Sequence, residues 1–190
     1  MKLIIGMTGA TGAPLGIALL QQLNKINHVE THLILSKWAK KTIELETSWD
    51  VRDVISLADY CYNSADQAAL VSSGSFRTDG MIIIPCSMKT LSGIRIGYAD
   101  GLIGRAADVV LKESRKLVLV PREMPLNTIH LENMLALSKL GVTILPPMPA
   151  WYNHPQSIED IINHIVCRVL DQFELDSDVA KRWKGTSSVN

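Results

Sequence analysis

The sequence of 190 residues predicts a three-layer α/β/α fold, with one parallel sheet, in a single domain. Short apolar runs alternate along the chain with segments of helical periodicity, which is typical of βαβ units. The apolar runs are nearly continuous, which indicates strands that are buried on both faces. Apolar residues make up 47% of the chain, and this fraction is sufficient for one hydrophobic core.

Each element follows from a local pattern. Residues 2–7 (KLIIGM) read as a buried strand before a glycine-rich turn, and Pro14 opens the helix that follows. The last helix has Ser157 at its N-cap and Asp160 three residues further on. The expected strands are 2–7, 30–36, 80–84, 116–121 and 142–145, and the expected helices are 13–25, 37–46, 87–96, 102–113, 128–140 and 157–173.

Two parts of the chain lack such a pattern. Residues 48–79 are the least regular segment, and residues 176–190 are mostly polar. We therefore expect one domain over residues 1–175, followed by a tail over residues 176–190.

Charge and cysteine content exclude several functional classes. Nineteen basic and nineteen acidic residues give a formal net charge of zero, without a run of Lys or Arg, so we expect no nucleic-acid partner and no lipid surface. No apolar run approaches the roughly 18 residues of a membrane span. Three widely spaced cysteines favour the reducing cytoplasm over disulfides, and five histidines without ligand spacing predict no metal site.

The first candidate site is the loop after the first strand, because ligands of open parallel sheets bind at the carboxyl ends of the strands. Gly6, Gly9 and Gly12 recur here before a helix whose N-terminus favours anions. The spacing differs from the Walker and dinucleotide patterns, and the second strand ends in Ser36-Lys37 instead of an acidic residue. The loop therefore fits a mononucleotide phosphate or another small anion, with a tight turn that binds nothing as the alternative.

The second candidate site is the loop Pro85–Thr90, which places two hydroxyl groups and a helix start at the same edge. These groups suit a phosphate or the polar edge of a flavin, with an ordinary capped helix as the alternative. Cys86 has no histidine partner in a known motif, so we expect a buried structural cysteine and not a nucleophile.

The third candidate site carries Arg122 and Glu123 directly after a buried strand, between Pro121 and Pro125. An arginine at this edge can bind a phosphate through two N–H groups, and the glutamate can transfer a proton if its pKa is raised. The alternative is an ion pair between the two side chains on the surface.

Two further cations belong to helices. Lys112 ends a helix that runs antiparallel to the strands, so we expect it at the amino edge of the sheet. Arg168 lies about 16 Å along the last helix at 1.5 Å per residue. Within one subunit both look too far from the glycine-rich loop, so they act across a subunit interface or belong to a solvated helix face.

The loops together resemble those of the UbiX/Pad flavin prenyltransferases. The matching segments are Thr8-Gly-Ala-Thr-Gly12, Pro85-Cys-Ser-Met-Lys-Thr90, Leu119-Val-Pro-Arg-Glu123, Ile129-His-Leu-Glu-Asn-Met134 and the region of Tyr152. The likeness extends from residue 2 to about Trp183. Each piece alone is common, but their combination is specific to this family.

The resemblance implies a flavodoxin- or Rossmann-like sheet and a homo-oligomer, often a dodecamer. It implies that the protein binds FMN and dimethylallyl phosphate and joins the prenyl unit to N5 and C6 of the reduced flavin. The prenylated FMN then serves a UbiD-type decarboxylase of phenolic or aromatic acids.

The family's site residues carry over to matching positions of this sequence. For FMN the resemblance implies Gly9, Ala10, Thr11, Ser36, Ser87, Met88, Lys89, Thr90 and Arg122. For the prenyl phosphate it implies Lys112, Arg122, Tyr152 and Arg168, with Trp183 beside the prenyl group. For catalysis it implies Glu123 as the acid or base beside N5, Glu46 near the prenyl pocket, and Thr11, where many relatives have Ser.

Two other functions stay open. A flavin-dependent cysteine decarboxylase of the phosphopantothenoylcysteine type resembles this fold, but it carries a Pro-Ala-Ser-Ala-Asn-Thr loop and a catalytic histidine, which this chain lacks at the matching place. A non-catalytic FMN carrier needs no second phosphate site, so Arg122-Glu123 and the further cations argue against it.

Overall fold

The computed structural model describes residues 1–183 and residue 185, and it divides the chain into two compact units, Met1–Pro146 and Pro147–Asn190. The expected division into residues 1–175 and 176–190 stays a prediction, and residues 184 and 186–190 of that tail lie outside the described residues.

The first unit contains a six-stranded sheet in the order β3-β2-β1-β4-β5-β6, and every neighbouring pair is parallel. The strands are β1 (Lys2–Met7), β2 (Glu30–Leu35), β3 (Tyr60–Asn63), β4 (Gly80–Cys86), β5 (Lys116–Pro121) and β6 (Thr143–Ile144). The strand order reverses between β1 and β4, which is the switch point where ligands of such sheets bind. The predicted parallel sheet is confirmed, with one strand more than expected.

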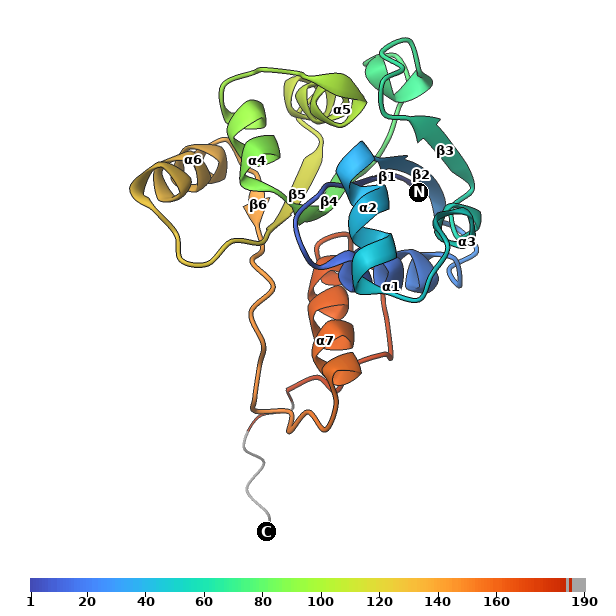
Figure 1. Cartoon of the computed structure of the whole chain (residues 1–190), viewed down its shortest axis with the longest axis vertical. Helices are drawn as coiled ribbons and strands as arrows, with labels where there is room; N and C mark the ends of the chain where they lie inside the picture. Colours follow the sequence, from blue (N-terminus) through green and yellow to red (C-terminus); the bar gives the residue numbers. More distant parts are fainter. Residues whose placement is uncertain (184, 186–190) are drawn as a thin grey trace. The chain divides into compact units, whose positions relative to one another are not determined.

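Helices cover both faces of this sheet, which gives the predicted three layers (Figure 1). The helices of the first unit are α1 (Ala13–Leu23), α2 (Lys37–Glu46), α3 (Val51–Ser56), α4 (Met88–Arg95), α5 (Gly101–Lys112) and α6 (Thr128–Lys139), with a 3₁₀ turn at Leu70–Ser72. On one face, Gly16 of α1 lies so close to Met7 and Ile84 that an added Cβ would be 2.6 Å from the Met7 methyl carbon. On the other face, Gly6 of β1 faces Ile103 of α5.

The core of the first unit explains why the strands read as continuous apolar runs. Ile4, Met81 and Leu119 point to the α5 face and belong to one buried cluster with residues of α4 and α5. Their chain neighbours, such as Ile5 and Ile82, are also fully buried. Since consecutive side chains of a strand point to opposite faces, both faces of the sheet are covered.

Residues 48–79 are more regular than the sequence suggested. They contain α3, whose N-cap Asp50 accepts the backbone N–H of Arg52 at 2.7 Å, and the edge strand β3. Strand β3 depends on contacts outside itself, because the ring of Tyr60 stacks on buried His32 of β2 at 5.0 Å between centroids. His32 also hydrogen-bonds the hydroxyl of Tyr62 at 2.9 Å.

Two arginines fix the segment that follows β3. The guanidinium of Arg105 donates to the carbonyl oxygen of Ser72 at 3.1 Å. That of Arg115 donates to the carbonyl oxygens of Gly74 and Phe76 at 2.8 and 2.9 Å. Side-chain bonds from α5 and its C-terminal turn thus replace regular backbone pairing here.

The second unit contains α7 (Ile158–Asp171), and its predicted start is confirmed. Ser157 Oγ accepts the backbone N–H of Asp160 at 3.1 Å, and the Asp160 carboxylate accepts the N–H of Ser157 at 3.1 Å. This is a reciprocal capping box. Among the described residues of the chain, no helix has both the length and the apolar character needed to cross a membrane.

Candidate functional site

Thr8 joins the first two candidate loops at the carboxyl edge of the sheet. Its buried hydroxyl donates to the carbonyl oxygen of Pro85 at 2.8 Å and accepts the backbone N–H of Ser87 at 2.8 Å. The end of β1 and the end of β4 are therefore held together at the point where the strand order reverses.

A cavity of about 470 Å³ opens at this point. Five predicted site residues line it: Gly9, Ser36, Ser87, Lys89 and Thr90. They come from the loops after β1 and β2 and from the start of α4, which follows β4. These three strands are adjacent, so chain topology gathers residues that are far apart in sequence. Ala10, Thr11, Met88, Arg122 and Glu46 do not line this cavity.

Gly9 is required where it stands because Trp38, at the start of α2, packs against it. A Cβ added to Gly9 would lie 2.3 Å from the Cβ of Trp38, which is not a possible distance. The backbone at Gly9 is exposed beside the cavity. A ligand there meets main-chain atoms without a side chain in between.

The N-terminus of α1 differs from the expected anion site. The carboxylate of Glu46, the last residue of α2, accepts the backbone N–H groups of Gly12 and Ala13 at 2.8 and 2.9 Å. Glu46 is thus an internal anion for this helix, and its negative charge disfavours a phosphate at the same place. Gly12 itself has a left-handed φ of 116°, which explains the glycine.

The start of α4 offers the donors that α1 does not. Ser87 is its N-cap, and the Ser87 hydroxyl lies 3.1 Å from that of Thr90. The first bond within the helix runs from Leu91 N–H to the Ser87 carbonyl, so the N–H groups of Met88 and Lys89 precede it. The side chain of Lys89 is 85% exposed and pairs with Asp100 at 3.4 Å.

The Arg122–Glu123 loop starts beside these residues, because the N–H of Arg122 donates to the carbonyl oxygen of Cys86 at 3.2 Å. Both side chains are exposed. The carboxylate of Glu123 accepts the N–H of Met124 at 3.3 Å. Among the ion pairs of the described residues, none joins Arg122 to Glu123, so the surface pair considered as the alternative is not formed.

Lys112 lies at the other end of the sheet from this cavity, as predicted. Helix α5 begins at Gly101, which lines the cavity, and ends at Lys112, about 16 Å further at 1.5 Å per residue. There Lys112 forms an ion pair with Glu113, and this pair lowers the pKa of the Glu113 carboxyl. Lys112 of one chain therefore does not serve the cavity of the same chain.

Cys86 is the structural residue that was expected. It is fully buried, and burial raises the pKa of its thiol to about 12. At neutral pH the thiol does not ionise, so it is no nucleophile. Among the described residues, no group of three His, Cys, Asp or Glu side chains is arranged to hold a metal ion.

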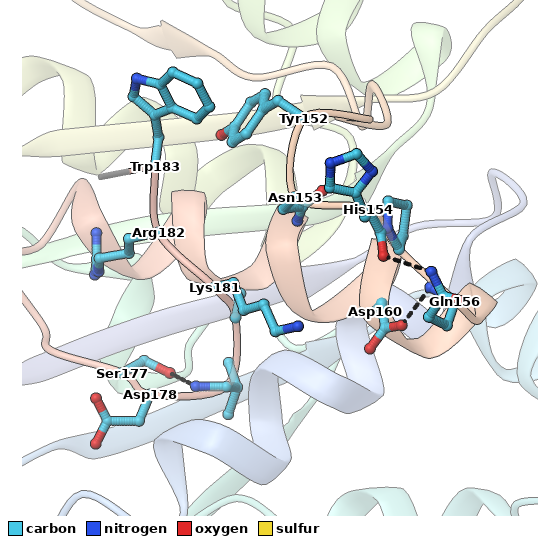
Figure 2. Close-up of a pocket in the computed structure, with 13 residues that line it drawn as sticks. Tyr152, Asn153, His154, Gln156, Asp160, Ser177, Asp178, Lys181, Arg182 and Trp183 are labelled. Carbon is cyan, nitrogen blue, oxygen red and sulfur yellow. Dashed lines mark hydrogen bonds between the residues drawn. The ribbon is translucent and has the colours of Figure 1, made fainter. Parts of the chain in front are cut away.

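Two predicted residues of the second unit, Tyr152 and Trp183, lie together at a cavity of about 990 Å³ (Figure 2). Their rings meet edge to face, with 5.4 Å between centroids. Tyr152 meets the ring of His164 in the same way at 5.8 Å. Burial and the positive charge of Arg168 lower the pKa of His164, which favours a neutral ring against Tyr152.

The sequence pattern did not single out several residues that line the first cavity, among them Trp38, Tyr98 and Asp100. A signal for the last two exists in the closely spaced glycines of residues 93–104. A Cβ on Gly104 would lie 3.1 Å from the Cα of Ala99, so small residues here allow α4, α5 and their connection to approach closely.

The chain is similar to known proteins over nearly its whole length. A family model described as Flavoprotein matches residues 1–170. An Escherichia coli protein named "Probable UbiX-like flavin prenyltransferase" is 73% identical over 185 residues, which are 97% of this chain and 94% of that protein.

Two solved structures share its fold closely. A dodecameric FMN-dependent UbiX-like decarboxylase from Escherichia coli O157:H7 has a TM-score of 0.96 at 73% identity, with 97% of this chain and 100% of that chain covered. AnUbiX (PadA1), in complex with FMN and dimethylallyl pyrophosphate, has a TM-score of 0.95 at 55% identity, with 97% of each chain covered.

Proposed function

The chain belongs to the flavoprotein family, among the UbiX-like flavin prenyltransferases, and we propose that it joins the dimethylallyl group of a prenyl phosphate to N5 and C6 of reduced FMN. The observation that carries this proposal is the cavity at the β1/β4 switch point, lined by hydroxyl groups and exposed backbone. The described relatives support the same chemistry, since one binds FMN together with dimethylallyl pyrophosphate.

The residues of this cavity fit a flavin mononucleotide. Its volume of about 470 Å³ is in the range of small-molecule sites. The α4 N-terminus, with the hydroxyls of Ser87 and Thr90, suits the phosphate of FMN. Gly9 and Ser36 offer backbone and hydroxyl contacts on the β1 and β2 side. Ala10, Thr11, Met88, Lys89 and Arg122 complete the proposed FMN site.

Prenyl transfer requires a second anion site, and we assign it to Lys112, Arg122, Tyr152 and Arg168. Reduced flavin supplies nucleophilic N5 and C6. In the proposed reaction, the C–O bond of the prenyl phosphate breaks with both electrons on the phosphate oxygen, N5 bonds to the freed carbon, and the N5 proton is released. For the second bond, the prenyl C=C bond takes up a proton, C6 bonds to the carbon that becomes positive, and C6 then loses its own proton. The cations stabilise the departing phosphate, and the aromatic face of Trp183 stabilises the positive charge on the allyl group.

Glu123 is the proposed acid or base of the reaction. It follows β5 directly and stands next to Arg122, so one loop supplies both a phosphate ligand and a proton acceptor. Thr11 is a candidate for a further proton transfer. Glu46 is proposed near the prenyl pocket, in addition to its contact with α1.

We propose that the site is completed by neighbouring copies of the chain. Lys112 lies about 16 Å from the cavity of its own chain, and a copy in a homo-oligomer can bring it to another cavity. The dodecameric assembly of the Escherichia coli relative supports this arrangement. A cytoplasmic location and delivery of the product to a UbiD-type decarboxylase are parts of the same proposal.

Mass spectrometry of the flavin tests the proposal directly. The purified chain is mixed with reduced FMN and dimethylallyl phosphate without oxygen, and the diphosphate is offered in a parallel reaction. A mass gain of one prenyl unit is expected. Decarboxylation of a cysteinyl substrate would instead indicate the cysteine decarboxylase, and FMN that stays bound but unchanged would indicate the carrier.

A further inference from the structure

The C-terminal segment Ser177–Trp183, here called the strap, forms one wall of the cavity in the second unit (Figure 2). The opposite wall is the loop Tyr152–Gln156 with Asp160 of α7. This cavity of about 990 Å³ therefore exists only while the strap is held in place. Figure 2 shows the side chains of Lys181 and Arg182 leaving the strap on opposite sides.

One carboxylate fastens the strap to α7. Asp171 accepts a hydrogen bond from Arg182 of the strap at 2.7 Å through one oxygen. Its other oxygen accepts a hydrogen bond from Arg168, one turn earlier in α7, at 2.6 Å. Each oxygen is thus committed to a different guanidinium, and Asp171 connects two segments 11 residues apart in sequence.

This ion pair is more sheltered than an ordinary surface pair. The side chain of Asp171 is 17% exposed and that of Arg182 is 48% exposed. In the surface pair of Asp50 and Arg52, the side chain of Asp50 is 51% exposed and that of Arg52 is 90% exposed. Because a sheltered charge pair is screened less by water and salt, it can fix a geometry that a surface pair cannot.

The ion pair between Asp171 and Arg182 lies next to two predicted prenyl-site residues, Trp183 and Arg168. Trp183 follows Arg182 directly, and its ring packs on Tyr152 at 5.4 Å between centroids. Arg168 uses one N–H for Asp171, and a guanidinium has five N–H donors, so donors remain for a phosphate. The Asp171 carboxylate therefore orients Arg168 without using up its binding capacity.

We propose that Asp171 and Arg182 are positioning residues for prenyl phosphate: their ion pair holds Trp183 against Tyr152, and the same carboxylate orients Arg168. This inference rests on the proposed function, because it refines the anion site assigned there. Neither residue is proposed to touch the reacting atoms.

Asp171→Asn separates positioning from simple charge. In the triad of Arg168, Arg182 and Asp171, the formal charges sum to +1, and Asp171→Asn raises the sum to +2. If only charge mattered, the variant would bind a phosphate dianion more tightly. If positioning matters, the KM for dimethylallyl phosphate rises, by about tenfold for the loss of one charge-assisted hydrogen bond.

The kinetic test measures KM for each substrate separately. Asp171→Asn is expected to raise the KM for dimethylallyl phosphate about tenfold and to leave the KM for reduced FMN unchanged. Arg182→Ala is also expected to raise the KM for dimethylallyl phosphate. Arg182→Lys is expected to keep the parent KM, because a single N···O contact joins residue 182 to Asp171 and an ammonium group can form it. An unchanged or lower KM for dimethylallyl phosphate in Asp171→Asn would overturn the inference.

The matched control is Asp108→Asn in the first unit. Asp108 accepts a hydrogen bond from Arg105 at 2.8 Å with the same three-residue spacing on a helix. The variant Asp108→Asn is expected to have the KM values of the parent for both dimethylallyl phosphate and reduced FMN. A rise in the KM for dimethylallyl phosphate in this control as large as that in Asp171→Asn would also overturn the inference.

A second measurement needs no activity. The fluorescence of Trp183 is obtained by subtracting the spectrum of a Trp183→Phe version from that of each protein. The subtraction removes the signal of the other three tryptophans. In Asp171→Asn and Arg182→Ala, quenching of Trp183 by acrylamide is expected to increase. Unchanged quenching overturns the strap inference, whereas a parent protein that transfers no prenyl group overturns the proposed function and leaves this test valid.

Discussion

The carboxylate of Glu46 accepts the backbone N–H of Gly12 at 2.8 Å, which makes the end of α2 the N-terminal cap of α1. The neighbouring N–H of Ala13 donates to the same oxygen at 2.9 Å. Without this carboxylate, α1 would begin with N–H groups that lack an acceptor in the loop, since Gly12 has no side chain to cap them.

Glu46→Ala is expected to lower the free energy of unfolding by about 1–2 kcal/mol, because it removes both the cap and a negative charge at a helix N-terminus. Glu46→Gln keeps an oxygen acceptor without the charge and is expected to cost less. Urea denaturation measures both. The control Glu44→Ala removes an exposed carboxylate of α2 that pairs with Lys41, and a loss in this control equal to that of Glu46→Ala would contradict the capping role.

Thr8→Val is expected to destabilise the protein by about 1–3 kcal/mol and to weaken FMN binding. The substitution keeps the shape of the side chain but removes the acceptor for the N–H of Ser87. Thr8→Ser keeps the hydroxyl and serves as the control. Urea denaturation and titration with FMN give the two quantities, and a valine variant equal to the parent in both would show that the bridge between β1 and β4 is dispensable.

Glu123→Gln is expected to lower prenyl transfer about 100-fold or more while FMN affinity and stability stay at the parent values. The side chain is exposed in the loop after β5, so its loss disturbs no core. Anaerobic turnover and FMN titration separate chemistry from binding. The exposed control Glu44→Gln should keep full activity, and full activity in Glu123→Gln would reject the proposed acid–base role.

Cys86 is expected to resist alkylation by iodoacetamide at pH 9 in the folded protein, whereas exposed Cys61 reacts. Burial raises the pKa of the Cys86 thiol from 9.0 to about 12, so the folded chain keeps a proton that the unfolded chain loses in this range. Its contribution to stability is therefore present below about pH 9 and is lost as the pH rises toward 12.

Urea denaturation between pH 8 and pH 10.5, at values chosen around the ordinary thiol pKa, compares the parent with Cys86→Ala. The difference in the free energy of unfolding between the two proteins is expected to shrink at high pH. A difference that is constant with pH, or rapid alkylation of folded Cys86, would contradict the burial of this thiol.

Elements with a strong local signal could be predicted from the sequence. Strands β1, β4 and β5 are continuous apolar runs, and this pattern has one common explanation in a sheet covered on both faces. The helix starts at Ser36 and Ser157 carry their own capping side chains. In these places the local preference and the tertiary structure agree.

Strand β3 could not be predicted because its stability is tertiary. It has four residues at the sheet edge, most of them exposed, and Tyr60 is ordered by stacking on His32. His32 lies 28 residues earlier in the chain, and pattern analysis has no means to pair the two. The same holds for Glu46 and Gly12, which are 34 residues apart.

The candidate site was predictable at the loops that directly follow strands and not elsewhere. Ser87 and Thr90 follow a strand and were found by position alone, and both line the cavity. Tyr98 and Asp100 reach it from the connection between α4 and α5, where the sequence gives only closely spaced glycines. Asp171 carries no motif, and its importance depends on a contact with Arg182 that only the folded chain shows.

The central place of β1 also affects how the chain is made. Its neighbours are β2 and β4, so β1 cannot complete its pairing until Gly80–Cys86 has been synthesised. At a synthesis rate of about 5–20 residues per second, β4 follows β1 after roughly 4 to 16 seconds. During that interval β2 can pair with one edge of β1, but the other edge stays open, and we expect the yield of the chain in cells to depend on chaperones that bind exposed apolar strands.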